Sequence, residues 1–283
     1  MKLASFTVEG RDTYGIVEGD QAVDLQSLKP TLGADLKQAL AVGQLQSLSD
    51  SQVANLPRFA LADVTLLPVI PNPGKVLCIG INYATHVRET GRDMPVFPMI
   101  FTRFADSQTA HLQPIVRPKV SHKLDFEGEL AIVIGKTARH IRKADALEYV
   151  AGYACYNDGS VRDWQKHTIQ FVPGKNFPNT GGFGPWLVTR DEISDPQNLE
   201  LTTRLNGEVM QHTATSDMIF DVGALIEYCS TFTELAPGDV IVSGTTGGVG
   251  AFREPPVWMQ PGDVVEVEIS QIGTLRNTIV DER

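Results

Sequence analysis

Residues 124–136, LDFEGELAIVIGK, decide how the central part of this chain folds. The run LAIVI is continuously apolar, which is typical of a strand buried on both faces. Acidic residues precede it at alternate positions, namely Asp125, Glu127 and Glu129. Because side chains two residues apart on a strand project from the same face, Glu127 and Glu129 are expected to point the same way at the mouth of a buried strand.

Such a carboxylate pair requires a counter-charge. Two carboxylates about 4 Å apart repel each other by about 4 kcal/mol at an effective dielectric constant of 20. A cation or a shared proton between them removes this cost, and oxygen-only ligands suit Mg²⁺, Mn²⁺ or Ca²⁺. A second pair, Glu266 and Glu268, alternates with apolar residues in VVEVEIS, the pattern of a strand with one face in solvent. Spacing alone therefore leaves a metal site and a structural pair equally open.

A third acid lies at the end of another predicted strand, VAGYACYND. Asp158 closes this strand and would complete a ligand set. The alternative is a turn aspartate that caps a short helix. Arg162 and Gln165 follow on the next turn.

A histidine and a glutamate lie three residues apart in GINYATHVRETG. Residues at this spacing are neighbours on a helix, and the carboxylate of Glu89 would fix the tautomer of His86 and raise its basicity. The pair could activate water. A surface hydrogen bond is the alternative interpretation.

Two further segments, rich in glycine, carry candidate site residues. FVPGKNFPNTGGFGPWLV contains one cation, Lys175, and VIVSGTTGGVGA is a turn after a strand that includes Thr245. The turn lacks the lysine and the spacing of nucleotide-binding loops. Its backbone amides could hold a carboxylate or an oxyanion.

Composition excludes several classes of protein. The 283 residues carry a formal net charge of −10, which argues against a nucleic-acid-binding surface. No apolar run approaches the ~20 residues that span a bilayer, and the first residues do not resemble a signal peptide. The three cysteines are isolated and are expected to be buried free thiols. We therefore expect a cytoplasmic protein that binds neither membrane nor nucleic acid.

The pattern of elements predicts an α+β protein in two parts. Residues 1–70 contain short strand-like runs and helical spacing, which indicates a small N-terminal α/β domain, and prolines at 68, 71 and 73 favour a linker. Residues 71–283 are rich in predicted strands, and Asn206–Gly207 predicts a tight hairpin.

Five motifs, in order between about residues 73 and 280, resemble those of the fumarylacetoacetate hydrolase family. They are INYATHVRE, DFEGELAIVIGK, GYACYNDGSVRDWQ, GKNFPNTGGFGPW and LAPGDVIVSGTTGGVG. The resemblance implies a β-rich mixed-sheet roll, a Mg²⁺ cofactor with Mn²⁺ or Ca²⁺ as alternatives, and a homodimer.

The same resemblance assigns roles to individual positions. It implies metal ligands, a catalytic His-Glu dyad with a lysine, and a set of substrate-binding residues. These are respectively Glu127, Glu129 and Asp158; His86 and Glu89 with Lys175; and Arg162, Gln165 and Thr245. Arg103 stands where many small members have lysine, and FPNTGGFGPW replaces an Asp-rich loop, so substrate identity is open. No family motif claims Asp125, which is expected to be structural.

The implied activity is metal-dependent hydrolysis of a carbon–carbon bond in an acylpyruvate or a related β-diketo acid, with water activated by the dyad. Two enzymatic alternatives remain, decarboxylation of oxaloacetate and isomerisation or hydration of unsaturated 2-keto diacids in aromatic catabolism. A non-catalytic binding member of the fold is an alternative of another class, but such a member would be expected to lack one of the acids or His86.

Overall fold

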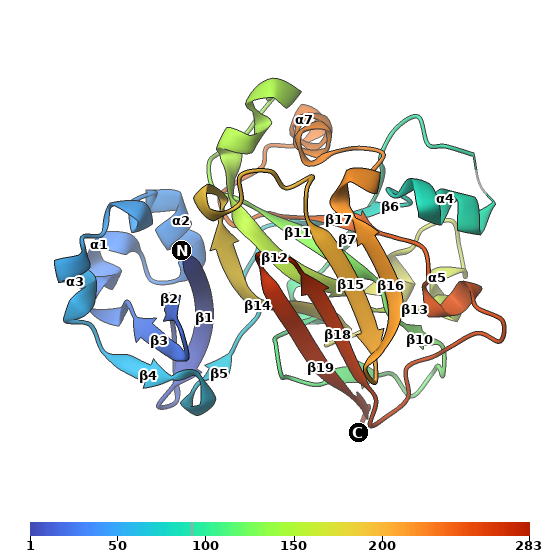
Figure 1. Cartoon of the computed structure of the whole chain (residues 1–283), viewed down its shortest axis with the longest axis horizontal. Helices are drawn as coiled ribbons and strands as arrows, with labels where there is room; N and C mark the ends of the chain where they lie inside the picture. The colour runs from blue at the N-terminus through green and yellow to red at the C-terminus, as the bar shows by residue number, and fades with distance from the viewer. Residues whose placement is uncertain (92) are drawn as a thin grey trace.

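The computed structural model describes residues 1–91 and 93–283, apart from the side chain of residue 90. In Figure 1 the N-terminal residues form a small lobe beside a larger β-rich body. The lobe comprises five strands, β1 (Lys2–Val8), β2 (Arg11–Glu18), β3 (Gln21–Asp24), β4 (Arg58–Ala60) and β5 (Thr65–Leu66), and three helices, α1 (Lys29–Leu32), α2 (Leu36–Val42) and α3 (Asp50–Ala54).

One twelve-stranded mixed sheet runs through both parts, in the order β4-β3-β2-β1-β14-β12-β11-β17-β6-β7, with β5 and β8 beside β1 and β14. Its strands in the larger body are β6 (Val76–Gly80), β7 (Met99–Arg103), β8 (Gln108–Thr109), β11 (Gly128–Ile134), β12 (Val150–Asp158), β14 (Gly181–Thr189) and β17 (Val240–Thr245). The run LAIVI is thus the middle of β11, buried throughout as predicted.

A second sheet packs against this one. Its order is β16-β15-β18-β19-β9, formed by β9 (Ile115–Arg117), β15 (Glu200–Leu205), β16 (Glu208–Ala214), β18 (Val264–Ile269) and β19 (Gly273–Asp281). The predicted hairpin joins β15 to β16, with Asn206 and Gly207 both at positive φ. A short pair, β10 (Leu124–Asp125) with β13 (Ser160–Val161), lies at the mouth of β11.

Among the described residues, the larger body has four α-helices: α4 (Ala84–Thr90), α5 (Arg162–Gln165), α6 (Val172–Lys175) and α7 (Val222–Phe232). One apolar cluster lies between the two sheets and includes the inner face of α7. A second cluster covers the other face of the long sheet and contains residues of the N-terminal lobe as well as of β11 and β12. The β-rich α+β fold is therefore confirmed.

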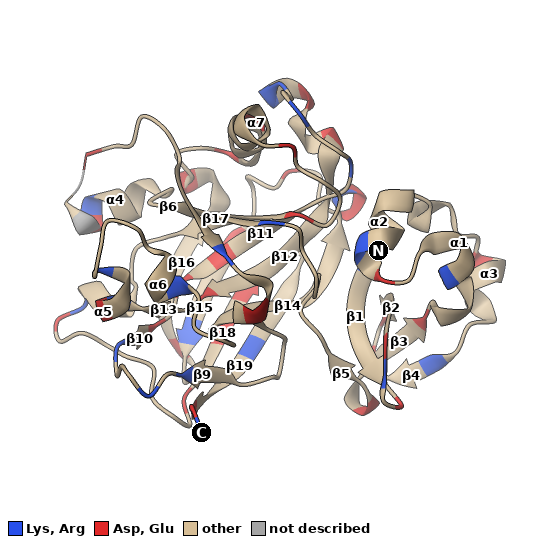
Figure 2. Cartoon of the chain, turned by 180° about the vertical axis from the view of Figure 1, so that it is seen from behind, with Lys and Arg blue, Asp and Glu red and all other residues tan. Residues whose placement is uncertain are grey.

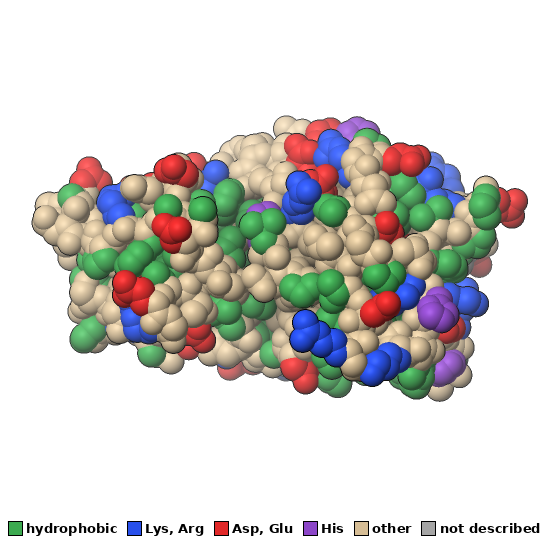
Figure 3. Space-filling model, turned by 90° about the horizontal axis from the view of Figure 1, so that it is seen from below, with side chains coloured by type: hydrophobic (Ala, Val, Ile, Leu, Met, Phe, Trp, Pro, Cys, Tyr) green, Lys and Arg blue, Asp and Glu red, His purple; other side chains and the backbone are tan. Residues whose placement is uncertain are grey.

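The surface carries charges of both signs. Acidic and basic side chains are interspersed on the face that Figure 3 shows, and in Figure 2 the basic residues near α5 and α6 lie close to acidic residues of the central sheet. Glu266 and Glu268 pair with Arg276 and Arg204 at the outer side of β18, as expected for a solvated pair.

All three cysteines are free and buried. No helix in the described ranges is long and apolar enough to span a membrane.

Candidate active site

The three predicted metal ligands converge at one end of β11. Strands β11 and β12 are antiparallel with Gly128 opposite Asn157, so the start of one strand meets the end of the other. The backbone N–H of Asp158 donates to the carbonyl of Glu127 at 2.8 Å. One carboxylate oxygen each of Glu127, Glu129 and Asp158 lie within 4.8 Å of one another, and all three residues are buried. Antiparallel pairing thus joins two motifs that are distant in sequence.

Two of these carboxylates are already paired with buried cations. Lys175 Nζ lies 2.6 Å from Glu127 Oε2 and 2.6 Å from Asp158 Oδ2. The remaining oxygens bind Arg162 Nη1 and Arg103 Nη1 respectively, each at 2.6 Å. Burial opposes ionisation of Glu127, but Arg162 and Lys175 outweigh it and lower its pKa. Burial likewise favours a neutral Lys175, but Asp158 and Glu127 outweigh it and raise its pKa, which favours the charged ammonium group.

Glu129 is the exception. Its Oε2 accepts a 2.6 Å hydrogen bond from the backbone N–H of Gly244, and within the described residues it has no basic partner. Burial, followed by the charges of Asp158 and Glu127, raises its pKa. An ionised carboxylate buried without a cation is costly, and a divalent ion would remove that cost.

The donor set therefore fits a divalent cation. Its ligands would be one carboxylate oxygen each of Glu127, Glu129 and Asp158, and such all-oxygen donors suit Mg²⁺, Mn²⁺ or Ca²⁺. The surrounding charges agree with this. The site contains four buried carboxylates, namely those of the trio and of Asp125. It contains three buried cations, Arg103, Arg162 and Lys175. With all seven groups ionised, these side chains carry one excess negative charge. A divalent ion would offset this negative charge.

The predicted dyad forms on α4. His86 Nδ1 lies 2.9 Å from Glu89 Oε2, and Glu89 Oε1 accepts from the backbone N–H of Gly248 at 2.8 Å. Burial opposes ionisation of Glu89, but the hydrogen bonds from His86 and Gly248 outweigh it and lower its pKa. A carboxylate on Nδ1–H leaves Nε2 as the basic nitrogen. Phe252 packs edge-on against the imidazole, with ring centroids 6.0 Å apart.

The amides of the glycine-rich turn do hold carboxylates, as the sequence suggested, but they are the protein's own. Gly244 N–H binds Glu129 and Gly248 N–H binds Glu89, so this one turn orients a metal-ligand candidate and the dyad together. The Thr245 hydroxyl donates to the Gly128 carbonyl at 3.0 Å and accepts from Gln211 at 2.9 Å.

The guanidinium of Arg162 is held by neighbouring side chains. Its Nε binds Asp125 Oδ2 at 2.8 Å and its Nη1 contacts Gln165 Oε1 at 3.0 Å. Its Nη2 is buried without a hydrogen-bond partner. Asp125 is fully buried and also accepts from the amides of Gly250 and Ala251, so its structural role is to aim the guanidinium and fix the turn.

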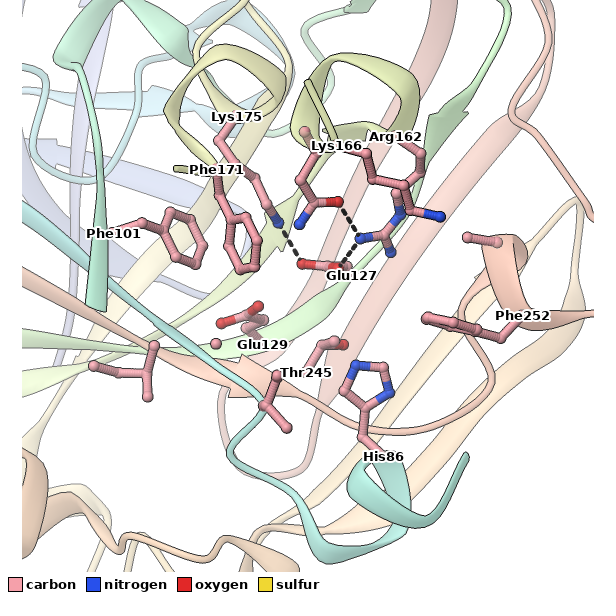
Figure 4. A pocket seen from close by; sticks show the side chains of 15 residues that line it. His86, Phe101, Glu127, Glu129, Arg162, Lys166, Phe171, Lys175, Thr245 and Phe252 are labelled. Carbon is pink, nitrogen blue, oxygen red and sulfur yellow. Dashed lines mark hydrogen bonds and ion pairs between the residues drawn. The ribbon is translucent and has the colours of Figure 1, made fainter. Parts of the chain in front are cut away.

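These groups surround one cavity of about 100 Å³. In Figure 4, His86 and Arg162 lie on one side of Glu129 and Phe101 on the other. Of the predicted residues, all line the cavity except Glu89 and Asp158, which lie directly behind His86 and Lys175. Sequence reasoning missed the wall residues Ile81, Phe101, Lys166, Phe171 and Phe252. Ile81 and Phe171 are the first residues of two recognised segments and Lys166 directly follows a third, whereas Phe101 and Phe252 carry no such signal.

Comparison with known proteins shows the family of this chain. The sequence pattern of the fumarylacetoacetate hydrolase C-terminal domain matches residues 75–280. The chain belongs to the fumarylacetoacetate hydrolase family.

Relatives within the fumarylacetoacetate hydrolase family differ in activity. The chain is 40% identical over 267 residues to the mitochondrial oxaloacetate tautomerase of Xenopus laevis, covering 93% of this chain and 84% of the relative. The solved fumarylacetoacetate hydrolase of Exiguobacterium antarcticum is 35% identical with a TM-score of 0.86, over 100% of both chains. The maleylpyruvate hydrolase of Sphingobium sp. SYK-6, solved with manganese(II) and pyruvate, is 28% identical with a TM-score of 0.84, also over 100% of both.

The three relatives named above are therefore enzymes that act on small keto acids, and one of them was solved with a divalent metal ion. The mitochondrial name of the Xenopus relative leaves the cytoplasmic location of this chain a prediction.

Proposed function

We propose that the protein is a divalent-metal-dependent enzyme of 2-oxo diacids that interconverts the keto and enol forms of oxaloacetate. The observation that carries the proposal is the position of His86, which Glu89 orients and which lines one small cavity together with Glu127 and Glu129 of the carboxylate trio. A base beside a polarised oxo group is what proton transfer at the adjacent carbon requires. The 40% identity to an oxaloacetate tautomerase over 93% of the chain supports this choice.

Different residues of the chain would bind the metal ion, transfer the proton and bind the substrate carboxylate. A divalent ion on the carboxylate trio would supply positive charge that polarises the substrate's oxo group. His86 Nε2 removes a proton from C3, the C–H electron pair forms the C2–C3 double bond, and the oxo π pair moves onto oxygen. Protonation of that oxygen completes the enol, and the reverse sequence restores the ketone. The unpartnered Nη2 of Arg162 is available for a substrate carboxylate, and the charged Lys175 balances negative charge beside the trio.

Hydrolysis of a carbon–carbon bond, which the sequence predicted first, stays the second candidate. The specific observation in its favour is the same dyad, which could take a proton from water instead of from carbon. The similarity to the maleylpyruvate hydrolase solved with manganese(II) and pyruvate supports it further. Isomerisation of unsaturated 2-keto diacids would use the same proton transfer on a longer substrate.

A substrate panel separates these activities. Enol-oxaloacetate, acetylpyruvate and fumarylpyruvate are followed by ultraviolet absorbance with Mg²⁺, Mn²⁺ or EDTA, while released pyruvate is assayed in parallel. We expect metal-dependent loss of enol absorbance from oxaloacetate without pyruvate release, and we expect His86→Gln to abolish it while metal binding persists. Pyruvate from acetylpyruvate would establish the hydrolase instead. Activity of full rate in EDTA would refute the metal requirement.

A further inference from the structure

The backbone of Ile81 lies in the left-handed region, at φ +57°. For a β-branched residue this conformation is an outlier, because the side chain crowds the neighbouring carbonyl. Folded proteins keep such conformations where the surroundings fix them, often at ligand-binding sites. Ile81 lies between the end of β6 and the start of α4, the helix that carries His86.

The next residue holds Ile81 in place. Asn82 is completely buried. Its Nδ2 donates to the carbonyls of Ser243 and Phe220 at 2.7 and 3.0 Å, and its Oδ1 accepts from the Phe220 N–H at 2.8 Å. Its own carbonyl accepts from the Ile219 N–H at 2.7 Å. These four hydrogen bonds fix the Asn82 backbone and side chain, so the preceding peptide has little freedom to relax.

The strained residue lines the active-site cavity. Ile81 is one of the apolar residues that line it, together with Ile79, Phe101 and Phe171, while Glu127, Glu129, Arg162 and Lys175 supply charged groups. Phe101 and Phe171 are in edge contact, with ring centroids 5.8 Å apart, so this wall is continuous at that point. In Figure 4 Phe101 lies away from Arg162 and His86, on the far side of Glu129. The cavity therefore offers cations to carboxylates and a hydrocarbon surface to the remainder of a ligand.

We propose that Ile81 is a specificity-determining residue. Its left-handed backbone places a branched side chain in the apolar wall, where it limits the length of carbon chain beyond the oxo group and so favours short 2-oxo acids. The strain is the consequence of keeping that side chain at this position. The proposal rests on the proposed function, in that the cavity must bind 2-oxo acids.

Binding of three probes to the Mn²⁺-loaded protein tests this directly. Isothermal titration is carried out with oxalate, pyruvate and 2-oxohexanoate on the wild type and on Ile81→Gly. Oxalate has no chain beyond its two carboxylates, so its affinity should change less than twofold. The affinity for 2-oxohexanoate relative to pyruvate should rise roughly tenfold, the size of effect that one or two methylene groups have in an apolar pocket.

The outcomes distinguish the two proposals. An unchanged 2-oxohexanoate to pyruvate ratio, in a variant that binds both acids, refutes the role of Ile81 and leaves the proposed function intact. Failure of the wild type to bind any 2-oxo acid in the presence of Mn²⁺ overturns the proposed function, and the role of Ile81 with it.

A stability comparison tests the strain separately. Ile81→Ala and Ile81→Gly lose the same apolar contacts, but only glycine accepts φ +57° without strain. We expect the glycine variant to melt about 2 °C or more above the alanine variant, the reverse of the usual order. Leu112 is a matched control, because it has φ +63° and is 66% exposed outside the cavity. Its alanine and glycine variants should show the same order of stability with no change in ligand preference. An Ile81→Ala variant as stable as Ile81→Gly would contradict the strain.

Discussion

At the scale of single residues, the buried acids of the site are not equivalent. Glu127 and Asp158 have ion-pair partners, whereas Glu129 depends on one backbone amide and on whatever cation the site takes up. Glu129 therefore destabilises the metal-free protein at neutral pH, and it is the residue through which a bound cation would contribute most to stability.

Replacing Glu129 tests whether this residue destabilises the metal-free protein and stabilises the metal-bound protein. Glu129→Gln keeps an acceptor for the Gly244 N–H but removes the charge. Without metal we expect the variant to be more stable than wild type by about 1–3 kcal/mol, because glutamine is neutral in the folded and the unfolded chain and escapes the burial cost that raises the pKa of Glu129. With Mg²⁺ its melting temperature should no longer rise, and activity should fall at least about 100-fold, as is usual for a lost metal ligand or its support. Thermal melts with and without EDTA measure both.

Glu268→Gln is the matched control, because Glu268 is 47% exposed and pairs with Arg204 at the surface. It should shift stability by under about 1 kcal/mol and leave metal dependence intact. A Glu129→Gln variant that still gains stability from Mg²⁺ would remove Glu129 from the ligand set.

His111 predicts a pH effect away from the site. Burial, with a smaller contribution from Arg276, lowers its pKa to about 4. The unfolded chain therefore binds a proton near pH 6.5 that the folded chain refuses until about pH 4. Stability from this group is complete above pH 6.5 and declines as the pH falls to about 4.

The measurement is the pH dependence of the melting temperature in that window. His111→Gln keeps a side-chain acceptor for the Arg276 N–H, which now donates to His111 Nδ1 at 3.1 Å, but cannot titrate. We expect its curve to be flatter than that of the wild type between pH 6.5 and 4. Parallel curves would show that His111 contributes nothing to acid sensitivity.

The sequence predicted those site residues whose interaction partners lie close by in the sequence. The pair His86–Glu89 and the alternate acids are local patterns with a direct chemical interpretation. The pairing of Arg103 with Asp158, 55 positions away, follows only from the sheet, so Arg103 could be recognised as a departure but not given a partner. The positive φ of Ile81 likewise depends on the contacts of Asn82 with residues 219–243.

At the scale of elements, the end of β17, which contains Gly244, and the glycine-rich turn after it join the metal site to the dyad. Gly244 has φ +100°, and a Cβ there would lie 2.7 Å from Asn82 Cβ and 3.0 Å from the Ile79 carbonyl. The backbone of β17 thus approaches the segment before α4 as closely as a glycine allows. The same glycine supplies the amide that binds Glu129.

Gly244→Ala should therefore damage both stability and function. We expect a loss of about 2–4 kcal/mol from left-handed strain and crowding together, with weakened Mg²⁺ binding because the Glu129 carboxylate loses its fixed amide. Gly262→Ala is the control, since Gly262 has φ +93° with no atom within 4 Å of the added Cβ. Strain alone should cost it about 1 kcal/mol, with unchanged metal affinity. Denaturant unfolding and Mg²⁺ titration decide between the two, and equal losses would contradict the crowding.

Individual strands and the hairpin could be predicted from the sequence, but the order of strands in the sheet could not. The buried run of β11, the end of β12 at Asp158 and the Asn206–Gly207 hairpin follow from periodicity and turn chemistry. The order of strands does not, because β11 lies between β12 and β17, which are over eighty residues apart. No local pattern records that pairing.

At the scale of the whole molecule, the sheet crosses the predicted boundary at residue 70. Strand β1 of the N-terminal lobe pairs with β14, and one apolar cluster includes Leu3 and Tyr14 together with Ala131 and Tyr156. The division into residues 1–70 and 71–283, like the homodimer, stays a prediction. What the structure does show is a core shared between the two parts.

A shared core predicts a single unfolding transition. Differential scanning calorimetry should give one peak whose calorimetric and van't Hoff enthalpies agree, and Leu3→Ala should lower its midpoint without splitting it, at a cost of about 2–4 kcal/mol. Two separable peaks, of which Leu3→Ala shifts only one, would show that the lobes unfold independently.

The junction between the lobes has a consequence for how the folded molecule opens. Register pairs between β1 and β14 are Lys2 with Val188 and Leu3 with Leu187, whereas β11 is paired along its whole length on the β12 side. Separation of the lobes would break this narrow seam and the apolar packing that the two parts share, but not the pairing of β11 with β12 that holds the carboxylate trio. In hydrogen–deuterium exchange, amides at the seam should label by local opening, ahead of those of β11 and β12, which wait for global unfolding.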